Sequence, residues 1–170
     1  MRMMYLALAA LVTLAACADT NGGYNTAGLE GGSGWNDTDI SSEDLNDPAS
    51  RGYFKNSVGD TVLFDVDEFT LNTASKAALD IQAEWLVSNP GYVIVLEGHA
   101  DERGTREYNL ALGFRRAQSV QEYLVARGVS GLRLKTRSYG KERPVEICSS
   151  ERCYEKNRRT VTILTQSLSL

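Results

Sequence analysis

Histidine and cysteine are scarce in this chain of 170 residues, which holds one histidine, His99, and three cysteines. A structural zinc site takes four protein ligands, usually cysteine and histidine, gathered in one place. Cys148 and Cys153 lie near each other, but His99 is far from them along the sequence. The composition therefore argues against a metal centre, and we expect no cofactor.

Positive charge is not in excess either. The chain has 18 Lys and Arg against 22 Asp and Glu, a formal net charge of -4 and a pI of about 5.1. Domains that bind nucleic acid normally carry a basic footprint. The basic pairs at 115–116 and 158–159 are too short to provide one, so we expect no nucleic-acid partner.

Long apolar stretches are confined to the N-terminus, and the mean hydropathy is -0.28. Arg2 precedes an apolar run at 6–14 that is too short for a membrane-spanning helix and is typical of an export signal. The run LAAC at 14–17 resembles the bacterial lipobox, which implies that residues 1–16 are removed and that Cys17 is lipidated. An ordinary secretory signal is the alternative. Asp19 stands one place later than an inner-membrane retention signal would need, so we expect an outer-membrane anchor.

Residues 17–47 then form the predicted lipidated N-terminus and a flexible linker, because 18–47 is rich in Gly, Asn, Asp, Ser and Thr. A folded domain is expected from Pro48 to the end, 48–170. In an exported domain Cys148 and Cys153 would meet an oxidising compartment. We expect them to form a disulfide worth about 2 kcal/mol, two free thiols being the alternative.

The apolar patterning of 48–170 predicts two amphipathic helices and four strands. The expected fold class is α+β, a β-α-β-α-β-β sandwich with two helices packed on one face of a mixed four-stranded sheet. On the helix at 73–89, the inward-facing residues are expected to be Ala74, Ala78, Ile81 and Trp85. Strands are expected at 61–66, 92–97, 132–139 and 159–165. A short helix at 48–57 precedes them. The two long helices are expected at 73–89, with a threonine cap, and at 106–127, capped by Thr105 and ended at Gly128.

Arg116 is out of place in this pattern. The inner stripe of helix 106–127 runs through Tyr108, Leu112, position 116 and Val120, so the guanidinium is expected on an apolar face beside Asn109. A buried guanidinium needs a partner that accepts hydrogen bonds, either a carboxylate of the protein or that of a ligand. Periodicity favours neither.

The loop at 98–104 is the second unusual feature, because it follows a buried strand and precedes a helix N-terminus, where ligand sites are common. Asp101 in this loop and Arg116 could bind the ammonium and the carboxylate of a zwitterion. Alternatively, Asp101 pairs with Arg116 or Arg103 and only holds the loop.

These residues belong to a longer pattern. The stretch EGHADERGT at 97–105, then EYN at 107–109, LG at 112–113, RRA at 115–117, SYGKE at 138–142 and KNRR at 156–159 resembles the OmpA-like peptidoglycan-binding domain family, in the form found in peptidoglycan-associated lipoproteins. The resemblance covers about 59–166.

The resemblance implies non-covalent binding of the meso-diaminopimelate stem of peptidoglycan, with Asp101 and Arg116 as the charged anchors. Asn109 and Leu112 would shape the pocket, Phe64 and Asp67 would contribute from the turn after the first strand, and Arg159 would help to close it. The turn at 64–68 and the loop between the two cysteines depart from the family pattern. The resemblance further implies an outer-membrane lipoprotein facing the periplasm, with TolB and other Tol proteins as partners and a role in envelope integrity and cell division.

Three other interpretations are weaker. The run VLFDVD at 62–67 resembles the first motif of haloacid-dehalogenase-type phosphatases, but Glu68 and Phe69 replace the expected Gly and Thr. A peptidoglycan hydrolase could use Glu97, Asp101 or Glu102 as a carboxylate pair, yet acidic loop residues are usually only solvated. A porin or a flagellar stator would need many strands or a transmembrane helix before the domain. We therefore expect a binding protein and no enzyme.

Overall fold

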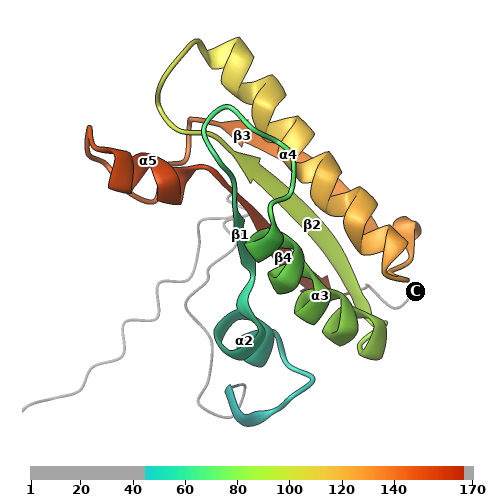
Figure 1. Ribbon diagram of the computed structural model, residues 1–170. Helices are drawn as coiled ribbons and strands as arrows, with labels where there is room; N and C mark the ends of the chain where they lie inside the picture. Colours follow the sequence, from blue (N-terminus) through green and yellow to red (C-terminus); the bar gives the residue numbers. More distant parts are fainter. Residues whose placement is uncertain (1–44, 167–170) are drawn as a thin grey trace, which may run out of the picture. The chain divides into compact units, whose positions relative to one another are not determined.

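The computed structural model describes residues 45–166 (Figure 1). The predicted export signal, the predicted lipidation site Cys17 and the predicted linker up to residue 44 lie outside the described residues. The described elements are α2 (Arg51–Tyr53), the π-helix η1 (Phe54–Gly59), β1 (Thr61–Leu63), α3 (Thr73–Ser88), β2 (Tyr92–His99), α4 (Arg106–Ala126), the 3-10 helix η2 (Gly131–Arg133), β3 (Leu134–Gly140), α5 (Glu151–Asn157) and β4 (Arg159–Gln166).

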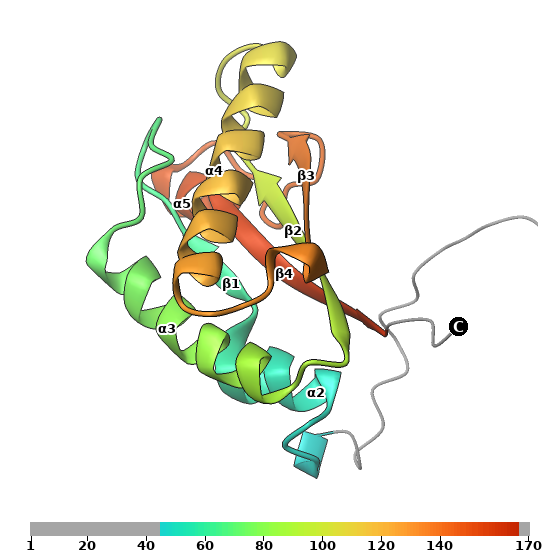
Figure 2. The ribbon, with the colours of Figure 1, turned by 90° about the vertical axis from the view of Figure 1, so that its right-hand side faces the viewer.

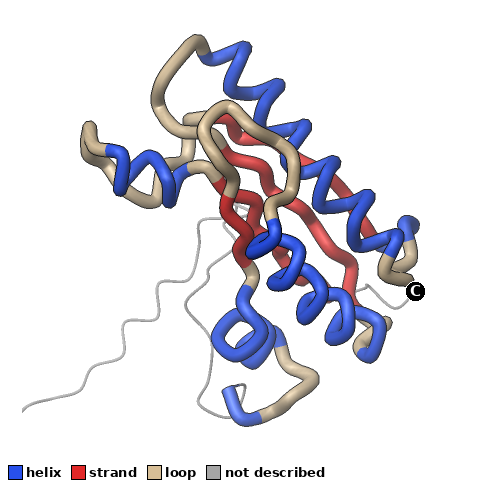
Figure 3. Tube along the Cα trace, in the orientation of Figure 1, coloured by secondary structure: helices blue, strands red, loops and turns tan. Residues whose placement is uncertain are grey.

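The four strands form one mixed sheet in the order β1-β4-β2-β3 (Figure 3). β4 runs antiparallel to both β1 and β2, whereas β2 and β3 are parallel. The parallel pair needs a crossover, and α4 provides it. Figure 2 shows α3 and α4 side by side on one face of this sheet. The predicted α+β fold is therefore confirmed.

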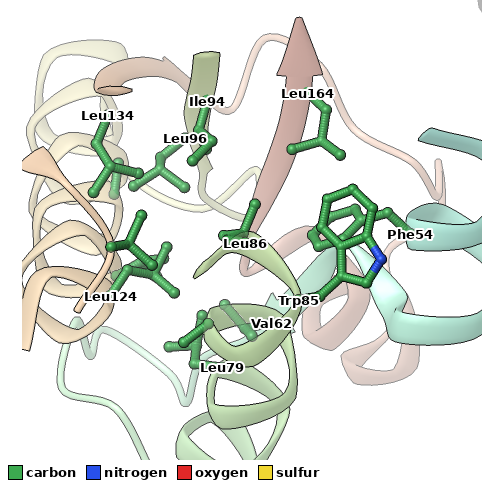
Figure 4. Packing of buried hydrophobic residues seen from close by; sticks show 14 of the residues in the cluster. Phe54, Val62, Leu79, Trp85, Leu86, Ile94, Leu96, Leu124, Leu134 and Leu164 are labelled. Carbon is green, nitrogen blue, oxygen red and sulfur yellow. The ribbon is translucent and has the colours of Figure 1, made fainter. Parts of the chain in front are cut away.

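The hydrophobic core lies between the sheet and these two helices (Figure 4). Leu79 and Leu86 of α3, Ile94 and Leu96 of β2 and Leu124 of α4 are completely buried. At one end the rings of Phe54 and Trp85 pack with centroids 4.8 Å apart. The Trp85 indole donates a hydrogen bond of 2.7 Å to the carbonyl of Pro48, which ties the start of the expected domain to the core.

The first long helix differs from the prediction in its cap and in its inner face. Asn72, and not a threonine, caps α3, because its side chain accepts a hydrogen bond from the amide of Ser75. Ile81, expected inside, is 55% exposed, whereas Gln82 is buried. Gln82 donates to the Gly59 carbonyl and accepts from the Thr162 hydroxyl. The prediction considered only apolar residues and therefore missed Gln82, a buried polar residue whose hydrogen bonds are satisfied.

Strand ends also differ from the prediction. β1 stops at Leu63 although the apolar pattern runs to Val66, because the chain turns away after Phe64 and Asp67 adopts a φ of 59°. β2 continues to His99, and β3 begins only after the 3-10 turn η2. The stretch between the predicted strands at 132–139 and 159–165, for which no helix was predicted, contains α5, which is rich in charged residues and has no long apolar stripe. In contrast, α4 is capped by Thr105 as predicted.

A close contact between backbones places α4 on β2. A Cβ atom added at Gly98 would lie 1.8 Å from the carbonyl oxygen of Gly113. The absence of side chains at both positions lets the helix approach the strand end, so the loop at 98–104 lies over the first turns of α4. No helix within residues 45–166 is long and apolar enough to span a bilayer.

Candidate functional site

A pocket of about 290 Å³ opens where the turn after β1, the loop after β2 and the first turns of α4 meet. Five residues predicted for the site line it together: Asp67, Asp101, Asn109, Leu112 and Arg116. The lining is completed by residues that the sequence analysis did not assign: Val66, Arg103, Gly104 and Tyr108.

The loop that carries Asp101 is held on both sides. The Asn109 side chain donates to the carbonyl of Arg103 at 2.7 Å. The Lys141 ammonium donates to the carbonyls of Glu102 (3.2 Å) and Gly104 (2.7 Å). Gly104 has a φ of +86°, which glycine adopts without strain. These bonds fix the loop, so Asp101 is presented to the pocket from a defined backbone.

The carboxylate of Asp101 pairs with two guanidinium groups. It lies 2.7 Å from Nη2 of Arg103 and 3.4 Å from Nη1 of Arg158. Burial by itself raises the pKa of Asp101, but hydrogen bonds and charge from Arg103, and a further bond from Arg158, outweigh burial and hold the pKa below its usual value. The group is therefore an anion at neutral pH. The alternative in which Asp101 pairs with Arg103 describes its contacts in the structure.

Arg116 is completely buried, and within residues 45–166 its hydrogen bonds go to backbone carbonyls and not to a carboxylate of the protein. The guanidinium donates to three backbone carbonyls, those of Glu68 (2.7 Å), His99 (2.9 Å) and Asp65 (3.2 Å). Burial lowers the pKa of Arg116 to about 10, so it remains a cation at neutral pH. Three of the five guanidinium N–H groups bind these carbonyls, and the side chain is part of the pocket lining.

Asp67 reaches the pocket through an unusual turn. Its φ of 59° is one that aspartate tolerates better than most residues. The Tyr108 hydroxyl donates a hydrogen bond to the Asp67 carboxylate, and this bond raises the pKa of Tyr108. Tyr108 is 49% exposed at the pocket rim and not on the inner stripe where periodicity put it. The sequence feature that could have identified Tyr108 as a site residue was its position one residue before Asn109, in the first turn of α4.

Phe64 and Arg159 are not among the residues that line the pocket. Phe64 is buried, with its ring centroid 5.2 Å from the Arg116 guanidinium carbon, so it supports the pocket from below. Arg159 is buried and donates to the carbonyls of Arg143 and Asn157. Its neighbour Arg158 reaches Asp101 instead. Arg158 is in the bend that ends α5 and Arg159 is the first residue of β4, so the two side chains leave the backbone in different surroundings.

Helix α5 flanks the loop that carries Asp101. Cys148 and Cys153 are joined in a disulfide whose Cα atoms are 5.9 Å apart, and it closes a loop around the start of α5. From the first turn of α5, Glu151 lies 2.8 Å from Nη2 of Arg158 and 3.6 Å from Nη1 of Arg103. Both arginines that hold Asp101 are thus also paired with α5.

The pocket has two carboxylates, Asp67 and Asp101, and two guanidiniums, Arg103 and Arg116, around the apolar side chains of Val66 and Leu112. This combination suits a small zwitterion. Glu97 and Glu102, named for a hydrolase, are not in the lining, and neither is Asp65. His99 is buried, and burial with the charges of Arg159 and Arg143 lowers its pKa to about 3, so it is neutral. Within residues 45–166 no cluster of acidic, histidine or cysteine side chains could hold a metal ion.

A second hollow, of about 410 Å³, lies between the end of α3 and the start of β2. It is larger, but no carboxylate, guanidinium or ammonium group lines it. Charge-assisted recognition therefore points to the smaller pocket.

Comparisons with known proteins identify the family of the domain. The model of the OmpA family matches residues 63–158. The chain belongs to the OmpA family. The matched region begins in β1 and ends at Arg158, so it contains every residue that lines the pocket.

Individual relatives and solved structures show which members of the OmpA family this chain resembles. The chain is 47% identical over 160 residues to the peptidoglycan-associated lipoprotein of Rhizobium meliloti (strain 1021), which spans 94% of this chain and 85% of the relative. It is 50% identical over 117 residues to that of Brucella melitensis, spanning 69% and 70%. The crystal structure of the peptidoglycan-associated lipoprotein from Burkholderia pseudomallei matches with a TM-score of 0.63 and 37% identity, covering 71% of this chain and 98% of that one.

More distant structures share the fold. The C-terminal domain of Helicobacter pylori MotB matches with a TM-score of 0.60 at 21% identity, covering 64% of this chain and 86% of that one. At this identity the likeness concerns the OmpA-like fold alone.

Proposed function

We propose that this protein is an outer-membrane lipoprotein that binds peptidoglycan without cleaving it and so ties the outer membrane to the cell wall. Its OmpA-like domain would hold the wall, and lipids on Cys17 would hold the membrane. The names of the relatives, peptidoglycan-associated lipoproteins, support this proposal.

The observation that carries the proposal is the gathering of opposite charges in one small pocket. The distal end of meso-diaminopimelate has an ammonium and a carboxylate on one carbon. Asp101 offers a carboxylate to the ammonium, and the guanidinium of Arg116 would donate to the ligand carboxylate. Asp67, Asn109 and Leu112 line the same pocket and would contact the rest of the stem.

The proposal includes a place in the Tol system. TolB and other Tol proteins would be partners, with a role in envelope integrity and in constriction of the outer membrane at division. This part is supported by the motif resemblance at 97–117 and by the lipoprotein relatives.

Co-sedimentation with purified sacculi tests wall binding. The full chain, in detergent micelles, should pellet with sacculi, and free meso-diaminopimelate should release it. Asp101→Asn should lose most of the pelleting, because the ammonium loses its carboxylate. Asp80→Asn is the matched control, since Asp80 pairs with Arg127 and does not line the pocket.

The outcomes separate the parts of the proposal. Urea unfolding of each variant checks that it is folded. If folded Asp101→Asn still pellets and meso-diaminopimelate does not compete, the pocket assignment is wrong although the wall is bound. If the unaltered chain never pellets, wall binding itself is wrong, and partner binding becomes the leading function.

A further inference from the structure

The Asp101 carboxylate is fully engaged by protein donors in the structure. Oδ1 accepts from the backbone N of Arg103 at 3.1 Å and from its Nε at 3.3 Å. Oδ2 accepts from Nη2 of Arg103 at 2.7 Å and from Nη1 of Arg158 at 3.4 Å. A carboxylate offers about four acceptor positions. An ammonium group that binds Asp101 must therefore take the place of one of these donors.

Arg103 is the donor that can leave. Its side chain is 44% exposed, whereas that of Arg158 is 5% exposed. Arg158 is also held by the carbonyl of Phe64 at 3.1 Å and by Glu151 at 2.8 Å. Moving Arg158 would break its contacts with Asp101, Phe64 and Glu151, whereas a rotation of the Arg103 side chain need break only its bonds to Asp101.

Arg103 also has a second set of partners, on α5. Nη1 of Arg103 lies 3.6 Å from Glu151, and its guanidinium carbon lies 4.6 Å from the centroid of the Tyr154 ring. A carboxylate and an aromatic face both attract a guanidinium. The disulfide Cys148–Cys153 spans the first turn of α5 and holds Glu151 in this position. A small rotation would therefore move the guanidinium off Asp101 and wholly onto Glu151 and Tyr154, which it already contacts.

We propose that Arg103 is a specificity-determining gate that competes with the ligand ammonium for Asp101, and that Glu151 and Tyr154 receive its guanidinium when the ammonium binds. The inference rests on the proposed function, because it assumes an amine-bearing ligand in this pocket. A ligand without an amine leaves Arg103 paired with Asp101 and gains nothing from the exchange. The gate thus favours stems with a free amine and disfavours stems without one.

A double-mutant cycle tests the gate. The dissociation constant of a soluble muropeptide with a tripeptide stem ending in meso-diaminopimelate is measured by calorimetry on the full chain in detergent. Arg103→Gln removes the competitor and should tighten binding about three-fold, the effect of a partly exposed ion pair. Glu151→Gln removes the receiving carboxylate and should weaken binding about three-fold by the same reasoning. In the double variant the Glu151 substitution should have no further effect.

Arg106→Gln is the matched control, because Arg106 is a nearby exposed arginine that pairs with Glu142 and does not line the pocket. Its affinity should equal that of the unaltered chain. The gate is overturned if folded Arg103→Gln binds equally well or more weakly. The transfer to α5 is overturned if Glu151→Gln weakens binding equally in both backgrounds, since it would then act through Arg158. An unaltered chain that binds no muropeptide overturns the proposed function, and the gate with it.

Discussion

At the scale of single residues, the contact between Gly98 and Gly113 sets how closely α4 approaches the sheet. We predict that Gly98→Ala lowers the free energy of unfolding by about 3 kcal/mol, the upper end of overpacking effects, because the new methyl group would meet the Gly113 backbone. Urea unfolding measures the change. Gly91→Ala is the control, since a Cβ there meets nothing within 4 Å. Equal losses at both positions would contradict the importance of this contact.

His99 gives the second prediction at this scale. It is the chain's only histidine, and its ring is buried with its centroid 5.6 Å from that of Tyr139. Burial, with the charges of Arg159 and Arg143, lowers its pKa from 6.5 to about 3. Between these values the unfolded chain binds the proton and the folded chain does not. The stability is therefore complete above about pH 6.5 and is lost as the pH falls, by up to about 1.4 kcal/mol per pH unit.

Unfolding in urea at several pH values tests this dependence. Carboxylates titrate mostly below about pH 5, so the slope between about pH 5 and 6.5 reports on His99. His99→Phe keeps a ring against Tyr139 and cannot titrate. The variant should have a flat profile in this window, and an unchanged slope would show that the histidine is not responsible.

At the scale of elements, the sequence predicted those whose cause is local. Thr105 and Gly128 lie at the two ends of α4 as predicted, and Arg116, singled out because it stands on an apolar stripe, lines the pocket. The features that the sequence did not predict depend on residues that are far away along the chain. Two of the three carbonyls that bind Arg116, those of Asp65 and Glu68, come from a turn about fifty positions earlier, and the path of that turn is set by the tertiary fold. Helix α5 has no long apolar stripe for periodicity to detect, and long-range ion pairs and a disulfide hold it in place.

The dependence of α5 on its disulfide is testable. Closing so short a loop contributes about 2 kcal/mol on the loop-entropy account. We predict that reduction lowers the free energy of unfolding by at most this amount, and that the loss is concentrated in α5. Amide hydrogen exchange should become faster at 151–157 and stay unchanged in β2, which lies at the centre of the sheet. Faster exchange throughout the sheet would show that the disulfide stabilises the whole domain and not one element.

At the scale of the whole molecule, the proposed function depends on two attachments, one at Cys17 and one in the pocket of the folded domain. Once lipids at Cys17 hold the membrane, the pocket meets the wall at a high effective concentration, so a modest affinity suffices for durable contact. We predict that vesicles carrying the chain purified from bacterial membranes co-sediment with sacculi. Cys17→Ala protein should bind sacculi but leave the vesicles in solution, and Asp101→Asn should remain on vesicles that do not sediment. Vesicles that still sediment with either variant would show that both attachments are not needed, and the tether as proposed would be wrong.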